Sequence, residues 1–378
     1  MSYESHFPKE SIDNIKRIAD VQEKLLEINN VDTVELKKEI LIGIEQGYLS
    51  VSTLIHLFLV ASEYRVLLTP MLCDFLNSLL NEKQELLPEV QKNLLNIFTK
   101  PFIIHCNHCF FARQCMDRKI INEKQVVEML RYIYMIRPTN PERLFTAFCW
   151  FAPEIQKLDL DLYEIIVGTM EMNLRSGYLN EIFINFYNIL KILSDNDWAV
   201  YRQCVMYGFN PNKYVILLAR DNVEFLEKDK EFNPNFLVPA CIFDCTHLFM
   251  DCKPTLLHVA AFFGAEKCFD YLLKVGANPN TKTSKYGTIA QYAFAGGNSN
   301  IIAKILQMKI DFDGVYETCA KFHRNNLFNY LLENNFLCDS FNPYDSCITQ
   351  SATAGNISLL IKCLENGTNV NEIDNVIL

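Results

Sequence analysis

One apolar segment near the C-terminal end of this chain recurs at a fixed interval, and this interval constrains the fold more than any other feature. The segment runs from Thr255 to Gly264 and reads TLLHVAAFFG. Downstream, Thr288 and Gly297 each lie 33 residues after their counterparts. Self-similarity of this length is typical of a solenoid, in which one helical pair cannot bury its own apolar face and stacking on neighbours completes the core. We therefore expect a stack of helical hairpins.

Four units of this pattern can be laid out, near residues 253–280, 286–313, 314–336 and 344–371. A glycine ends the first helix of three units, where a left-handed residue is least strained, and His323 takes that place in the third. A degenerate unit precedes them from residue 213, with one helix expected over 219–226 and an insertion over 236–252. The repeats are thus expected to occupy residues 213–378.

The motifs of the first full unit resemble the ankyrin repeat. They are the Thr-x-Leu-His opening at Thr255, the Ala260-Ala261 pair, the helix-ending Gly264 and the Gly-Ala-Asn turn at Gly276. With a long helical region before the repeats, the chain also resembles divergent ankyrin proteins of trichomonad-like protists. The resemblance implies an all-α fold, an α-solenoid of ankyrin-type repeats. It also implies a non-catalytic scaffold that binds a protein partner.

Residues 1–200 lack the repeat signature but are rich in helical patterns, broken where proline follows a polar residue. We expect them to form a helical N-terminal domain of unknown role. The helices are predicted over 11–29, 35–45, 52–64, 70–81, 88–98, 123–136, 141–151, 160–171 and 179–193.

Charge and hydropathy narrow the classes of partner. The formal net charge is −10, and no run of Lys and Arg is longer than two, so a nucleic-acid partner is not expected. The longest apolar stretch, over 49–61, is too short to span a bilayer, and the first residues are too polar for a secretory signal. These features predict a cytoplasmic protein without membrane insertion.

Two groups of Cys and His could bind metal. Cys106 and Cys109 have zinc-like spacing beside His105 and His108, and a second group holds Cys241, Cys245, His247 and Cys252. Neither group has a second close pair at matching spacing, and both lie in apolar surroundings. We therefore expect reduced, buried thiols and no metal, cofactor or catalytic residue, with a zinc- or thiol-dependent function as an alternative.

The resemblance implies a concave partner-binding surface formed by the residues that precede each helix-ending position and by the fingertips. The candidate contacts are Phe262, Phe263, Lys282, Ser284, Lys285, Ala295, Lys321 and Phe322. Adjacent Phe262 and Phe263 are typical of an aromatic anchor at an interface. The alternative that one ring packs on the neighbouring finger stays open.

Two further expectations concern the ends of the chain. The N-terminal helices could recruit machinery such as a ubiquitin ligase, which would make the protein an adaptor. The last helix is apolar on nearly every side. We therefore expect Ile361 or its neighbours to stay exposed and to mediate self-association or partner docking. The alternative is that the natural protein continues further.

Overall fold

The protein is built from helices. The computed structural model describes residues 8–99, 105–136, 141–229, 231–250, 253–283, 287–334, 336 and 342–368. Within these residues the only β-type pairing is an isolated antiparallel bridge between Leu237 and Thr255. The prediction of an all-α fold is confirmed. None of the described helices combines the length and the hydropathy needed to cross a membrane.

The chain divides into two compact units, and each takes segments from distant parts of the sequence. We call them the repeat unit and the helical unit. The repeat unit comprises Met1–Lys24, Asn212–Val238 and Asp251–Leu378, and the helical unit comprises Leu25–Pro211 and Pro239–Met250.

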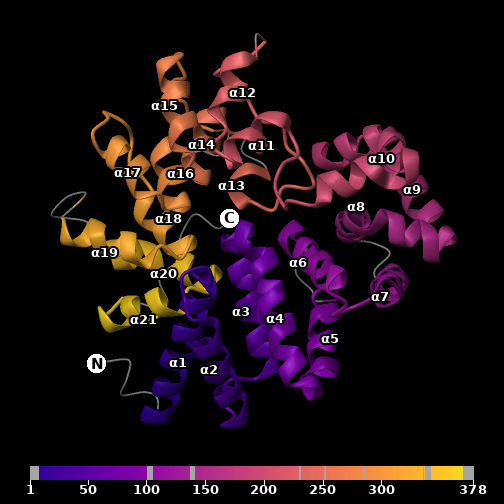
Figure 1. Cartoon of the computed structure of the whole chain (residues 1–378), viewed down its shortest axis with the longest axis horizontal. Helices are drawn as coiled ribbons and strands as arrows, with labels where there is room; N and C mark the ends of the chain where they lie inside the picture. The colour runs from indigo at the N-terminus through magenta and orange to yellow at the C-terminus, as the bar shows by residue number, and fades with distance from the viewer. Residues whose placement is uncertain are drawn as a thin grey trace. The chain divides into compact units, whose positions relative to one another are not determined.

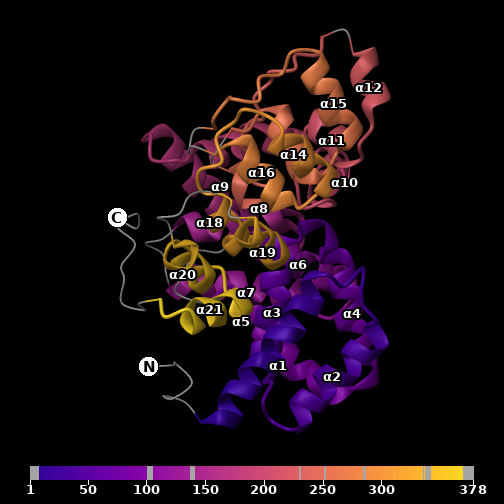
Figure 2. The same cartoon turned by 90° about the vertical axis from the view of Figure 1, so that its left-hand side faces the viewer.

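The repeat unit stacks five helical hairpins. The first helices form one row, in which each contacts the next, and the second helices lie along one side of that row (Figures 1 and 2). The first helices are α11 (Lys213–Ala219), α14 (Leu256–Phe263), α16 (Ile289–Gly296), α18 (Val315–Lys321) and α20 (Pro343–Thr353). The second helices are α12 (Val223–Lys228), α15 (Glu266–Lys274), α17 (Ser299–Leu306), α19 (Asn325–Glu333) and α21 (Ile357–Glu365).

Every first helix ends next to a residue with left-handed backbone geometry, as the repeat pattern predicts. The φ angles are 71° at Gly264, 83° at Gly297, 52° at His323 and 67° at Gly355. In the degenerate unit Asp221 adopts φ 49° and separates α11 from α12, so the prediction of one helix over 219–226 is wrong. The Asp221 carboxylate accepts a hydrogen bond from the backbone N–H of Cys268 at 2.9 Å. This hydrogen bond caps α15 of the next hairpin and so stabilises the left-handed turn.

Polar side chains join consecutive hairpins by donating to backbone carbonyls at the helix ends. The side chain that follows the left-handed residue reaches back to the preceding hairpin. Nδ2 of Asn298 donates to the carbonyl of Gly264 at 3.4 Å, and Nδ2 of Asn356 donates to that of Ala320 at 2.8 Å. Nε of Arg324 donates likewise to the Ala295 carbonyl at 2.9 Å.

The N-terminal helix α1 (Lys9–Leu26) continues this pattern at the far end of the stack (Figures 1 and 2). Nε2 of Gln22 donates to the carbonyl of Gly355 at 2.8 Å, and its Oε1 accepts from the backbone N–H of Ile357 at 3.2 Å. Lys16 forms an ion pair of 3.5 Å with Glu365. The last hairpin is therefore capped by α1, contrary to our expectation of an uncovered end, and Ile361 is half-buried.

The helical unit contains ten complete α-helices and the end of α1 within its described residues. Two of the helices are kinked: α8 loses helical geometry at Phe151, just before Pro153, and α10 does so over Asp195–Trp198. The helices are the end of α1, α2 (Thr33–Glu45), α3 (Val51–Tyr64), α4 (Thr69–Glu82), α5 (Leu87–Asn96), α6 (Cys106–Asp117), α7 (Glu123–Ile136), α8 (Pro141–Leu158), α9 (Leu160–Arg175), α10 (Glu181–Val205) and the single turn α13 (His247–Met250).

An aromatic core attaches the segment 239–250 to the helical unit. The ring of Phe243 lies 5.6 Å from that of Trp150, 6.0 Å from Phe186 and 5.7 Å from Tyr201. The indole N–H of Trp150 donates to the carbonyl of Ile242 at 3.2 Å. Buried aromatic pairs of this kind stabilise a fold by more than the apolar area that they bury would contribute. These contacts explain why the segment 239–250 belongs to the helical unit and not to the repeat unit.

Candidate partner-binding surface

Helix α14 exposes only its last two side chains. Residues 256–261 are all buried, whereas Phe262 and Phe263 are half-buried. The two rings lie 5.4 Å apart in an edge-to-face arrangement. Half-buried aromatic pairs that are held by a rigid helix are typical of protein interfaces, because ordering them on binding costs little further entropy.

The aromatic packing beneath this pair reaches the hairpin after next because α16 ends in a glycine. A Cβ at Gly296 would lie 2.2 Å from the carbonyl oxygen of Phe262, so no larger residue fits there without a shift of the backbone. Across this gap the ring of Phe262 lies 6.3 Å from that of Phe322, which belongs to the hairpin after next. Gly296 thus allows aromatic side chains of the first and third full repeats to meet.

Two of the predicted contacts are lysines. Lys321 is exposed, and within the described residues it forms no ion pair. Lys282 is exposed on the preceding finger and binds Asp311 at 2.6 Å, an interaction that solvent screens. Lys321 is therefore available to a carboxylate of a partner.

Other predicted contacts are placed differently. Ala295 is 1% exposed and Phe322 is 2% exposed, so their side chains support the surface from below. Ser284 and Lys285 lie outside the described residues. The remaining surface residues are Phe262, Phe263, Lys282 and Lys321.

His258 has a structural position. Its Nδ1 shares a hydrogen bond of 2.7 Å with Oγ1 of Thr255, and its ring lies 4.7 Å from that of Tyr292 in the next hairpin. Burial lowers the pKa of His258 to about 4, so the ring is neutral near pH 7. A buried neutral imidazole that joins two repeats is a packing element of the stack.

The described cysteines of the two sequence groups lie at buried or half-buried positions. Burial raises the pKa of the Cys109 thiol well above its usual range and that of Cys241 to about 12, which disfavours the thiolate that zinc requires. No cluster of three or more potential metal ligands occurs among the residues that the structure describes. Cys252 lies outside them.

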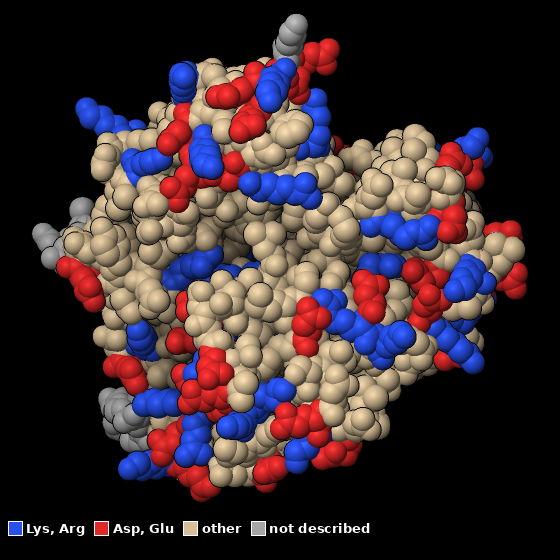
Figure 3. All heavy atoms as spheres, in the orientation of Figure 1, with Lys and Arg blue, Asp and Glu red and all other residues tan. Residues whose placement is uncertain are grey.

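Positive and negative side chains are interspersed over the face of the molecule drawn in Figure 3. Lys and Arg alternate with Asp and Glu there, without a continuous basic stripe. A nucleic-acid scaffold needs such a stripe to neutralise phosphates. Charges of both signs are thus present on this face.

Several residues that carry this architecture were missed by sequence reasoning. Gln22 lies 333 residues from its partner Gly355, and no local motif marks it. Arg324 has a signal, because it lies one position after the helix-ending His323, at a site that contacts the neighbouring hairpin.

Comparison with known families bears on the same segment. Residues 255–284 match the family model of the ankyrin repeat. Comparison with the curated proteins gives no match. The matched residues comprise α14, α15 and the finger that follows, which is the hairpin that presents the aromatic pair.

Proposed function

We propose that this chain is a non-catalytic scaffold, and that its repeat unit binds a protein partner through a surface centred on Phe262 and Phe263. The ankyrin repeat at residues 255–284 supports a role in protein–protein interaction. The observation that carries the proposal is the exposure pattern of α14, which buries six residues and presents only these two rings. The partner would insert an apolar anchor beside them.

The charge near the rings suggests the partner's chemistry. Lys321 is exposed beside an apolar surface and has no ion pair among the described residues. A carboxylate of the partner can therefore pair with it at the rim, where such contacts steer association more than they add affinity. We propose an apolar segment flanked by acidic residues as the ligand.

Capture of partners by the immobilised full chain tests this proposal. Phe263→Ala should abolish retention of the specific partner, and Lys321→Glu should weaken it in a salt-dependent way. Phe225→Ala is the matched control, because Phe225 is 60% exposed on α12, away from α14. Equal capture by the Phe263 and Phe225 variants would contradict the proposal.

The same experiment separates the adaptor alternative. Proteins that remain bound to the Phe263→Ala variant would be retained by other surfaces of the chain. If these include ubiquitin-ligase components, the protein recruits machinery as well as a client. If every specific partner is lost with Phe263, the simple binder is the better description.

A further inference from the structure

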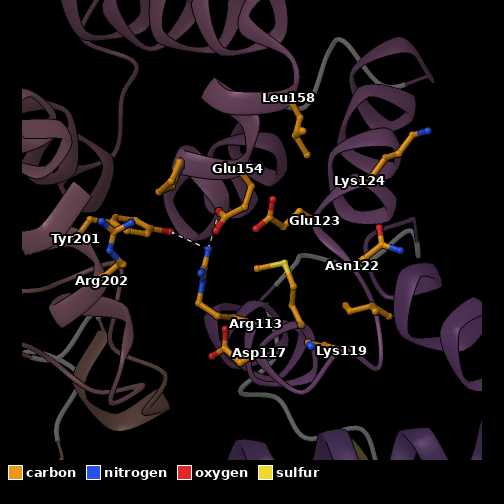
Figure 4. A pocket seen from close by; sticks show the side chains of 13 residues that line it. Arg113, Asp117, Lys119, Asn122, Glu123, Lys124, Glu154, Leu158, Tyr201 and Arg202 are labelled. Atoms are coloured by element: carbon orange, nitrogen blue, oxygen red, sulfur yellow. Dashed lines mark hydrogen bonds and ion pairs between the residues drawn. The ribbon is translucent and has the colours of Figure 1, made fainter. Parts of the chain in front are cut away.

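The helical unit contains a pocket that the binding of a partner by the repeats does not use. Its volume is about 700 Å³, within the range of small-molecule sites. The lining comes from α6, α7, α8, α10 and the loop between α6 and α7 (Figure 4). Apolar walls are provided by Met116, Ile121, Pro153 and Leu158.

A buried arginine forms the floor. Arg113 is 7% exposed, and its guanidinium lies 5.1 Å from the centre of the Phe151 ring and 5.6 Å from that of Tyr201. Nε and Nη2 donate to the carbonyl of Trp150, which the kink at Phe151 frees from the helix, and Nη2 also binds Glu154 at 2.8 Å. These contacts fix the guanidinium rigidly.

The floor keeps unused donors. Within the described residues Nη1 of Arg113 has no acceptor, although it belongs to a side chain that lines the pocket. The Tyr201 oxygen accepts from Nη2 at 3.5 Å, which leaves its own O–H without an acceptor in the same residues. Burial raises the pKa of Tyr201, so the phenol keeps this proton. N–H and O–H donors that lack an acceptor beside a pocket favour an anionic oxygen.

Lys119, on the wall of the pocket, has a backbone conformation that is unfavourable for a residue with a side chain. We take this conformation to indicate that its side chain has a function. It follows α6 with φ 61°, in a turn where glycine would cost less. Asp221 and His323 occupy similar left-handed turns, and both use their side chains, on the N–H of Cys268 and the carbonyl of Ala354. Lys119 has no side-chain partner among the described residues, yet it lines the pocket.

Most charged groups of the lining are paired. The lining holds four cations and three carboxylates. Glu154 is bound to Arg113 and Glu123 to Lys157 at 2.8 Å, while Arg202 is bound to Asp197 at 2.7 Å and Lys124 to Glu128 at 3.7 Å. Lys119 and Asp117 are left without an ion pair among the described residues. The lining residues are Arg113, Lys119, Lys124 and Arg202 against Asp117, Glu123 and Glu154.

From these observations we propose that the pocket binds a small organic monocarboxylate with an apolar body. The carboxylate pairs with Nη1 of Arg113, the Tyr201 hydroxyl and Lys119, while the body lies along Met116, Pro153 and Leu158. Phosphate suits the site less, because its second charge would approach Asp117.

Calorimetric titration of the full chain with benzoate and hexanoate tests the site. Saturable binding with a Kd of roughly 1 mM or tighter is expected. Benzyl alcohol and inorganic phosphate should bind at least about tenfold more weakly than the carboxylates. A tenfold difference in affinity corresponds to the loss of one charge-assisted hydrogen bond. Failure of both carboxylates to bind, or equal binding of benzyl alcohol or phosphate, would overturn the proposal.

Variants locate the binding without loss of the fold. Lys119→Gly should raise the melting temperature, because it relieves the left-handed strain, and should weaken benzoate binding about tenfold. Tyr201→Phe removes only the hydroxyl and should also weaken binding. Lys267→Gln, at an exposed position in the repeat unit, is the matched control. Undiminished binding by both Lys119→Gly and Tyr201→Phe would show that the carboxylate sits elsewhere and would refute the site.

Discussion

The side-chain amide of Gln22 donates a hydrogen bond of 2.8 Å to the backbone carbonyl of Gly355, 333 residues further along the chain. The same amide accepts from the N–H of Ile357. This pair repeats the contact that Asn298 makes with Gly264 between successive hairpins. A helix from the N-terminal end of the chain thereby takes the position of a following repeat and satisfies the last helix end.

Gln22→Ala should therefore destabilise the repeat unit although no ankyrin motif is touched. Gln22 is 1% exposed, and its loss leaves a half-buried carbonyl and N–H without this partner, at a cost of about 1 kcal/mol. Urea unfolding followed by circular dichroism measures the change. Gln46→Ala, at an exposed position after α2, should be nearly neutral. Equal effects of the two substitutions would remove the capping role of α1.

Gly264→Val should destabilise the stack by at least about 1–2 kcal/mol, because a β-branched residue is disfavoured in left-handed geometry. Here φ is 71°, and an added Cβ would also lie 3.1 Å from Nδ2 of Asn298. Gly168→Ala supplies a control of opposite sign. Gly168 lies inside α9 with no atom within 4 Å of an added Cβ, so alanine should stabilise by about 0.5–1 kcal/mol. An unchanged melting curve for Gly264→Val would place the helix end elsewhere.

The stability of the repeat unit should fall as the pH drops from about 6.5 to about 4. Burial lowers the pKa of His258 in the folded state to about 4, so the unfolded chain binds the extra proton across this window. The contribution is fully present above pH 6.5, and its loss amounts to up to about 3 kcal/mol. Chemical denaturation at several pH values measures it. His258→Gln should flatten the profile, whereas His56→Gln, at an exposed position, should leave the slope unchanged.

The thiols of the helical unit should be inert in the folded protein. Cys109, Cys149 and Cys245 are buried, and burial raises the pKa of each thiol well above its usual range. Alkylation by iodoacetamide at pH 8, read by mass spectrometry, should spare them until denaturant is added. A strong chelator should leave the thermal transition unmoved. A large drop in melting temperature on chelation would instead support a zinc site at Cys106 and Cys109.

Local regularity explains which parts of the fold could be predicted. The 33-residue period identified the left-handed positions at Gly264 and Gly297. His323 lies only 26 residues after Gly297, and the shortened third unit placed it correctly, because the geometry of the turn depends on position in the unit more than on residue type. The repeat pattern did not predict the left-handed turn at Asp221. Aspartate stands there in place of glycine, so the sequence around it is typical of a continuous helix. The contact between Gln22 and Gly355 has no periodic signature, because it depends on the tertiary structure that brings α1 next to the last hairpin.

The candidate site could be predicted in part for the same reason. The pattern selects the positions before each helix end, but their exposure depends on the neighbouring side chains. Phe322 is buried because the missing side chain of Gly296 lets it approach Phe262. The pocket at Arg113 was not foreseen, because its floor depends on a kink at Phe151 and on a tyrosine 88 residues away.

The central claim is that Phe262 and Phe263 serve binding more than folding. Its most direct measurement compares, for Phe262→Ala, the change in affinity for the captured partner with the change in unfolding free energy. The account predicts that affinity falls by at least about 30-fold, equivalent to 2 kcal/mol at an interface hot spot. The unfolding free energy should change by less than about 1 kcal/mol, since the ring is only half-buried. Loss of stability as large as the loss of binding, or unchanged affinity, would assign the ring to the core and contradict the account.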